Sequence, residues 1–360
     1  MLLSYKLWLS DRFFPLTPVF DFLPSISNPV DWGVIYIVAV FIALNFVYPS
    51  GKKLLFILIA VLFILALLDQ NRWQPWFFQY FFMLTAFAIT SHSKLIFDET
   101  ETRLKILQLI IAGVYFWSGI GKFNSGFYNE VVPWLTHPFY QFLPKNLDFI
   151  IEYFTFSIPF IELFVGIGLF HRKTGKMAII FAIITQLFIL ITLSPLGYNY
   201  NFVMWPWNIA MIFFVVLLFF NLPVVSLSNL KVLLKSHAVK MIFLLFWLMP
   251  FLNLFNLWPA YLSSSFFSGN TNEGTVYLSD KSASFLPQQL TNYLDNENTP
   301  NIINIKSWSM KELNVPAYPE KRVFNSIKNY FYQFASDSSE IVMVYSEKSS
   351  LQKKPEPEIY

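Results

Sequence analysis

The sequence predicts an all-α transmembrane helix bundle of about eight spans with a small extracytoplasmic α/β C-terminal domain. Hydrophobic residues make up 55% of the chain and charged residues only 13%, whereas an ordinary soluble domain carries about 25% charged residues. The apolar residues are gathered in repeated stretches between residues 32 and 258. The remainder, residues 260–360, has the composition of a separate polar domain. These observations predict an integral membrane protein with a folded part outside the membrane.

The lengths of the apolar stretches predict where the helices cross. Roughly 20 apolar residues in a helix cross the bilayer core. On that measure the predicted spans are residues 32–49, 53–69, 74–90, 105–122, 150–170, 176–194, 203–222 and 239–257. The N-terminal segment, residues 1–31, mixes Trp8, Phe13, Phe14 and Phe20 with polar residues and is therefore predicted to lie in the membrane interface. A ninth span within residues 1–22 is the alternative.

Lysine and arginine residues in the loops predict how the bundle is oriented. One set of loops contains Lys52, Lys53, Lys94, Arg103, Lys105, Arg172, Lys173, Lys176, Lys231, Lys235 and Lys240. The other side carries Lys6, Arg12, Arg72, Lys122 and Lys145. Because cytoplasmic loops carry the excess of positive charge, the N-terminus and the C-terminal domain are predicted to lie outside the cytoplasm.

Residues 260–348 are predicted to fold as a small α/β domain. Strands are expected at residues 275–278, 302–306 and 341–345. Pro319 is expected to open a helix whose apolar face is Val323, Ile327, Phe331 and Phe334. The tail, residues 349–360, is rich in proline and charge and is predicted to be disordered. Since the domain has no recognisable catalytic motif, it is expected to pack against the bundle or to bind a partner protein.

The composition also excludes several kinds of chemistry. The chain has no cysteine, which excludes disulfide bridges, thiolate metal sites and iron–sulfur clusters. The histidines are His92, His137, His171 and His237, and they lack the i, i+3 or i, i+4 spacing of a metal site, so no metal is expected. The net charge of +3 is spread over the loops. The predicted partner is therefore a lipid bilayer and not a nucleic acid.

An ionisable residue in each of two consecutive spans is the first candidate for chemistry. Lys122 ends the fourth span and shares a helix face with Tyr115 and Ser118. Glu162 lies deep in the fifth span, where a carboxyl group needs a partner or a proton. Lys122 and Gln186 are the candidate partners. The structural alternatives are a lysine that extends its ammonium to the lipid headgroups and a glutamate that makes a buried helix–helix hydrogen bond.

Small residues near these ionisable groups are a further feature of the fourth and fifth spans. Gly119 and Gly121 precede Lys122, and Gly166 follows Glu162 by one helical turn. Residues without a side chain let neighbouring backbones approach within a membrane. We therefore expect a neighbouring backbone to come close to the end of the fourth span at Gly119 and Gly121.

Further polar residues gather at the same end of the bundle. Asp69 and Arg72 lie between the second and third spans, and Asn208 lies near the start of the seventh. Together with Tyr115 they are predicted to line the entrance of an outward-facing cleft and to bind substrate. The structural alternatives are a helix-end ion pair for Asp69 and Arg72 and a helix cap for Asn208.

Short motifs in the bundle resemble one membrane-protein superfamily. They are YFWSGIGKFNSGFYNEVVPWL at 115–135, LLDQNRWQPW at 67–76, MWPWNIAMI at 204–212 and PFIELFVGIGLF at 159–170. The first three are similar to the vitamin K-dependent gamma-carboxylase-like superfamily, which includes bacterial HTTM membrane proteins. The last is similar to the more distant DoxX-like proteins. This resemblance implies a multi-pass protein of the bacterial inner membrane.

The resemblance also implies a role for Lys122. In the carboxylase, the lysine at this helix end acts as base toward vitamin K hydroquinone on the lumenal side, so a quinone is the implied cofactor. The family enzyme has two adjacent lysines where this chain has Gly121 and Lys122. It also has a catalytic histidine, whereas no predicted span here supplies one. Glutamate carboxylation itself is therefore not expected.

Two functions of different classes follow. The first is an enzyme or redox-associated subunit that acts on or binds a quinone or lipid-like molecule at the non-cytoplasmic end of the bundle. Lys122 would be its base or anchor and Glu162 the proton partner of that lysine. The second is a non-enzymatic scaffold or binding component of a cell-envelope complex, with the C-terminal domain as its docking surface. A transporter ranks third, because no inverted repeat or pair of broken helices is evident.

Overall fold

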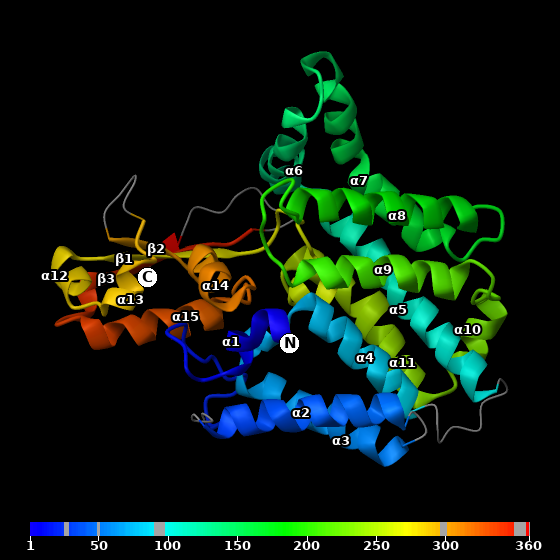
Figure 1. The fold of residues 1–360 in the computed structure, drawn as a ribbon, viewed down its shortest axis with the longest axis horizontal. Coiled ribbons are helices and arrows are strands. Elements are labelled where there is room, and N and C mark those ends of the chain that lie inside the picture. The colour runs from blue at the N-terminus through cyan, green and yellow to red at the C-terminus, as the bar shows by residue number, and fades with distance from the viewer. Residues whose placement is uncertain (25–28, 49–50, 90–97, 296–300, 349–357, 360) are drawn as a thin grey trace.

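The computed structural model describes residues 1–24, 29–48, 51–89, 98–295, 301–348 and 358–359. A helical segment occupies each stretch predicted from the apolar runs (Figure 1). These are α2 Val30–Val47, α3 Lys52–Leu68, α4 Pro75–Ile89, α5 Glu99–Gly121, α7 Asp148–Gly168, α8 Gly175–Leu193, α9 Met204–Phe219, and the composite of α11 His237–Phe243, η7 Leu244–Leu248 and η8 Met249–Phe255. The predicted helices are therefore present, with shifted boundaries.

Short elements connect these helices. They are η1 Leu2–Ser4, α1 Tyr5–Trp8, η2 Gln70–Arg72, η4 Phe127–Val131, α6 Val132–Thr136, η5 His137–Gln141, η6 Lys145–Leu147, α10 Leu227–Leu233 and η9 Tyr261–Ser263. The elements from η4 to the start of α7 form an arm that projects from the bundle at the top of Figure 1.

Several helices have the length and composition of membrane spans. Among the described residues, five segments are long and apolar enough to cross a membrane: Val30–Val47, Glu99–Gly121, Lys145–Gly168, Gly175–Leu193 and His237–Phe255. The most apolar window of α5 is 83% buried inside the protein, against 11% for α2. α5 is therefore the central helix of the bundle, whereas α2 presents most of its apolar surface outward.

The contact between α5 and α7 depends on glycine. A Cβ atom at Gly119 would lie 2.6 Å from the backbone N of Leu163, and one at Gly166 would lie 2.6 Å from the backbone N of Phe116. These two glycines therefore let the two helix backbones touch, which confirms for Gly119 the expected approach of a neighbouring backbone. Gly121 differs from the prediction, because its nearest neighbour is the Ser265 side chain at 3.3 Å and not a helix backbone.

The C-terminal residues form an antiparallel sheet of order β2-β1-β3-β4 with helices packed on it (Figure 1). Its elements are β1 Glu273–Leu278, α12 Asp280–Ser284, α13 Gln288–Thr291, β2 Ile302–Asn304, α14 Ile305–Leu313, α15 Lys321–Phe331, η10 Tyr332–Phe334, η11 Ser338–Glu340, β3 Ile341–Ser346 and β4 Glu358–Ile359. Val276 of β1 pairs with Met343 of β3, and both are fully buried. The buried face of α15 includes the predicted Val323, Ile327 and Phe331.

Two details of this domain differ from the prediction. Residues 305 and 306 begin α14 instead of continuing a strand, because the Asn304 side chain caps that helix by accepting the Ser307 N–H at 2.9 Å. The predicted disordered tail, residues 349–360, lies mostly outside the described residues. Residues 358 and 359 pair with the end of β3 as β4 and are therefore ordered.

The N-terminal segment lies between the bundle and the C-terminal domain (Figure 1). Trp8 is 1% exposed and Phe14 is 0% exposed, so these two rings pack inside the protein, whereas Phe20 is 50% exposed. The backbone N–H groups of Phe13 and Phe14 donate to the Glu312 carboxylate of α14 at 2.6 and 3.0 Å. The Phe14 ring also packs on Trp308 of α14, with centroids 4.8 Å apart. The segment therefore joins the two parts of the molecule.

Candidate functional site

The ion pair between α5 and α7 lies in the interior of the bundle. Lys122 directly follows α5, and its ammonium donates to Glu162 Oε2 at 2.7 Å, to Ser118 Oγ at 2.6 Å and to the Ser118 carbonyl at 3.3 Å. The Lys122 side chain is 3% exposed and the Glu162 side chain 13% exposed. The lysine therefore does not extend to a headgroup layer. Of the two candidate partners for Glu162, the structure selects Lys122.

These two side chains line a small cavity, here called the Lys122 chamber. Its polar lining is Tyr115, Ser118, Lys122, Glu162, Thr185, Gln186 and Asn208. The chamber measures about 30 Å³, which suits a water molecule better than an organic ligand. Gln186 Nε2 donates to the Tyr115 hydroxyl at 2.9 Å, while Gln186 Oε1 has no hydrogen-bond partner among the described residues. Because an unpaired buried acceptor costs free energy, the chamber favours an occupant that donates a hydrogen bond.

A much larger cavity, here called the interdomain cavity, lies between the bundle and the C-terminal domain. It measures about 460 Å³, within the range of small-molecule sites. Its aromatic lining is Trp76, Trp134, Tyr198, Tyr200, Tyr261, Phe266 and Phe267. Met204, Phe266 and Phe267 line both this cavity and the Lys122 chamber. These three side chains therefore stand between the two spaces.

Charged side chains of the C-terminal domain and of the arm also line the interdomain cavity. Lys348 Nζ lies 2.7 Å from Glu130 in η4 and 3.3 Å from Glu273 in β1, and Lys306 Nζ lies 3.5 Å from Glu273. Burial lowers the pKa of Lys348, but its hydrogen bond to Glu130 and the charge of Glu273 raise that pKa overall. The lysine stays charged and ties the arm to the C-terminal domain beside the cavity.

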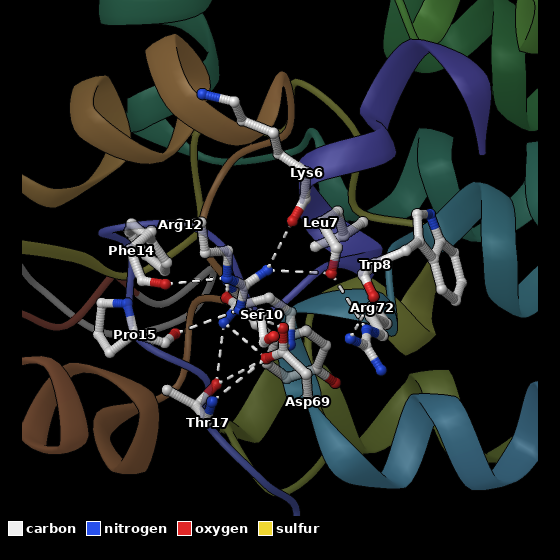
Figure 2. A network of polar contacts seen from close by, with 12 residues as sticks. Lys6, Leu7, Trp8, Ser10, Arg12, Phe14, Pro15, Thr17, Asp69 and Arg72 are labelled. Atoms are coloured by element: carbon white, nitrogen blue, oxygen red, sulfur yellow. Dashed lines mark hydrogen bonds and ion pairs between the residues drawn. The ribbon is translucent and has the colours of Figure 1, made fainter. Parts of the chain in front are cut away.

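Asp69 belongs to a separate buried network (Figure 2). Its carboxylate pairs with Arg12 at 2.5 Å and accepts from the Thr17 hydroxyl at 3.1 Å and from the Asn71 N–H at 3.1 Å. The Asp69 and Arg12 side chains are both 0% exposed. The carboxylate therefore holds the N-terminal segment against the end of α3.

Arg72 extends the same network. Its guanidinium donates to the carbonyls of Leu7 at 3.1 Å, Trp8 at 3.0 Å and Leu65 at 2.7 Å. Burial lowers the pKa of Arg72 to about 10, partly offset by the charge of Asp69, so the side chain is cationic at neutral pH. Neither Asp69 nor Arg72 lines the interdomain cavity or the Lys122 chamber.

The predicted site residues therefore fall into two groups. Lys122, Glu162, Tyr115 and Asn208 share the Lys122 chamber, although Asn208 Nδ2 donates to the Met204 carbonyl of its own helix at 2.6 Å. Asp69 and Arg72 hold the N-terminal segment instead. Sequence reasoning missed the phenylalanines at 266 and 267, whose only signal was an aromatic pair within the small-residue run SSSFFSGN.

Among the residues that the structure describes, no cluster of three or more His, Asp or Glu side chains could hold a metal ion. No protein-family model, curated protein or solved structure matches this chain. The functional assignment therefore rests on the geometry of the two cavities.

Proposed function

We propose that this protein binds a quinone or lipid-like small molecule at the non-cytoplasmic end of its helix bundle and acts on its polar head. The observation that carries the proposal is the interdomain cavity, whose volume of about 460 Å³ and aromatic lining suit the apolar body of such a molecule. The adjoining Lys122 chamber offers the unpaired acceptor Gln186 Oε1 to a polar head group, beside the positive charge of the Lys122 ammonium. Lys122 is the anchor or base, and Glu162 is the group that takes its proton.

The same proposal includes the membrane topology. We propose that α3, α4 and α9, with 17, 15 and 16 residues, cross the bilayer together with the five longer segments. The membrane of this proposal is a bacterial inner membrane, and the loop charges predict the C-terminal domain on its outer side. The outward apolar surface of α2 then contacts lipid.

Mass spectrometry of the protein purified in mild detergent tests the binding proposal. Wild-type protein is expected to carry a neutral amphiphilic molecule. The Lys122→Met variant is expected to carry at least about tenfold less of it, because the head group of that molecule loses about 1.4 kcal/mol or more of binding energy. Lys105→Met is the control, since Lys105 is a buried, ion-paired lysine within α5, the helix that Lys122 follows, and its Nζ lies 3.2 Å from Glu101. Equal amounts of the molecule in all three proteins, or none in the wild type, would contradict the proposal.

A second proposal is a scaffold role for the C-terminal domain in an envelope complex. Its support is two exposed aromatic residues on either side of α12 in the sequence: Tyr277 is 40% exposed and Phe285 is 57% exposed. α12 lies at the end of the domain far from the bundle (Figure 1). If an envelope protein docks there, a Tyr277→Ser/Phe285→Ser variant loses crosslinks to that partner while Lys122→Met keeps them. Unchanged crosslinks in the double variant would reject the docking surface.

A further inference from the structure

We propose that Phe266 and Phe267 form a partition that limits the size of the molecule reaching the Lys122 chamber from the interdomain cavity. Both phenylalanines line both spaces, together with Met204 at the start of α9. They belong to the loop that joins η9 to β1, residues 264–272. The nature of the admitted molecule rests on the proposed function, whereas the partition can be tested without any ligand.

Each phenylalanine ring is held by a tryptophan of the bundle or of the arm. The centroid of Phe266 lies 4.5 Å from that of Trp207 in α9, with the ring planes at 33°. The Phe267 ring stacks on Trp134 of α6 at 5.6 Å and 23°. Trp134 stacks in turn on Tyr198 at 4.8 Å. Ring contacts of this kind are individually weak, so one ring can move without unfolding the bundle.

The backbone of the loop is held in an uncommon conformation. Ser264 has φ 58° and Phe267 has φ 45°, in the left-handed region that non-glycine residues rarely adopt. Such a conformation persists only when its surroundings hold it. Here Asn124 Nδ2, just beyond the end of α5, donates to the Ser268 carbonyl at 2.8 Å. The loop is therefore fastened next to the helix end that carries the lysine.

The sizes of the two spaces show what the partition does. The Lys122 chamber holds about 30 Å³ and the interdomain cavity about 460 Å³. With both rings in place, only a group the size of water fits beside the ammonium. A larger head group reaches Lys122 only if a ring turns aside, so Phe266 and Phe267 select ligands by the cross-section of the head group.

Cysteine labelling tests this partition. Because the chain has no cysteine, one introduced thiol reports one position. Thr185→Cys places a thiol in the Lys122 chamber, and Thr271→Cys places one at the interdomain cavity as the matched control. Each is treated with a small reagent, 2-aminoethyl methanethiosulfonate, and with a bulky methanethiosulfonate that carries a benzophenone. The rate at Thr185→Cys is divided by the rate at Thr271→Cys for each reagent.

With the phenylalanines present, this normalised rate is expected to be at least about tenfold lower for the bulky reagent than for the small one, because the bulky reagent requires a larger local opening. Phe267→Ala is expected to remove most of that difference, with Phe267→Leu intermediate. If Phe267→Ala does not fold, as judged by size-exclusion chromatography, Phe267→Leu and Phe266→Leu provide the same comparison.

The proposed partition would be overturned if the normalised labelling rates of the two reagents were equal in the protein with both phenylalanines. It would also be overturned if their difference stayed unchanged in the leucine and alanine variants. The comparison of the two reagents needs no co-purified molecule to be present. A protein that carries no amphiphile but shows the expected labelling therefore rejects the proposed function and keeps the partition. The reverse result keeps the function and rejects the partition.

Discussion

At the scale of single residues, Lys122 and Glu162 depend on one another. Removing one member of a buried ion pair leaves the other charge without a partner and costs about 3 kcal/mol or more, whereas replacing both by apolar residues is often close to neutral. We therefore expect Lys122→Met to lower the thermal unfolding temperature strongly and Lys122→Met/Glu162→Leu to restore most of it. Tryptophan fluorescence during heating in detergent measures this. Additive losses in the double variant would show that the pair is not coupled.

Glu320, just before α15 in the C-terminal domain, is expected to make the stability of the protein depend on pH. Burial raises the pKa of Glu320 above its ordinary value of 4.5, and Glu347 raises it further, while Arg322 opposes the shift. A carboxyl with a raised folded-state pKa costs stability when ionised, and the cost disappears as pH falls through the folded pKa toward the unfolded one. Glu320→Gln should therefore unfold at a higher temperature than wild type at about pH 7, and the advantage should vanish below pH 4.5. An advantage that does not change with pH would contradict this origin.

At the scale of helices, the α5–α7 contact depends on the absence of side chains. A Cβ at Gly119 would meet Leu163 N at 2.6 Å and Pro159 O at 2.8 Å, both of them backbone atoms that cannot turn aside. We expect Gly119→Ala to destabilise the protein by about 1–3 kcal/mol, as overpacking does. Gly33→Ala in α2 is the control, because a Cβ there meets nothing within 4 Å. Equal unfolding temperatures for the two variants would show that α5 and α7 can move apart to accept the added methyl group at no cost in stability.

The helices could be predicted from the sequence because each is indicated by a run of apolar residues that are consecutive in the chain. Twenty apolar residues suffice to indicate a membrane helix, and a carboxyl deep in such a helix must find a partner. That reasoning led to Lys122 and Glu162. It could not place Asp69, because the ion pair with Arg12 joins residues 57 positions apart and forms only when the N-terminal segment folds into the protein. The partition formed by Phe266 and Phe267 likewise exists only once the C-terminal domain has packed on the bundle.

At the scale of the molecule, the bundle, the N-terminal segment and the C-terminal domain share one hydrophobic core. Buried residues of that core include Phe14 of the N-terminal segment, Trp308 of α14 and Trp207 of α9. The interdomain cavity is enclosed by residues from both sides of this junction. Any molecule bound there therefore contacts helices of the bundle and the polar domain together. Under the proposed topology, the side of the membrane on which that domain lies decides from where the cavity is reached.

The absence of cysteine makes that orientation directly measurable. Ser284 at the end of α12 and Lys235 after α10 are both exposed, and the proposed topology, which follows the loop charges, predicts that they lie on opposite sides of the membrane. In intact bacterial cells, a membrane-impermeant maleimide should label Ser284→Cys through any pores of the outer envelope and leave Lys235→Cys unlabelled. After the inner membrane is permeabilised, both thiols should react. Labelling of Lys235→Cys alone in intact cells would invert the topology, and the interdomain cavity would then open toward the cytoplasm, where its ligand would have to be sought.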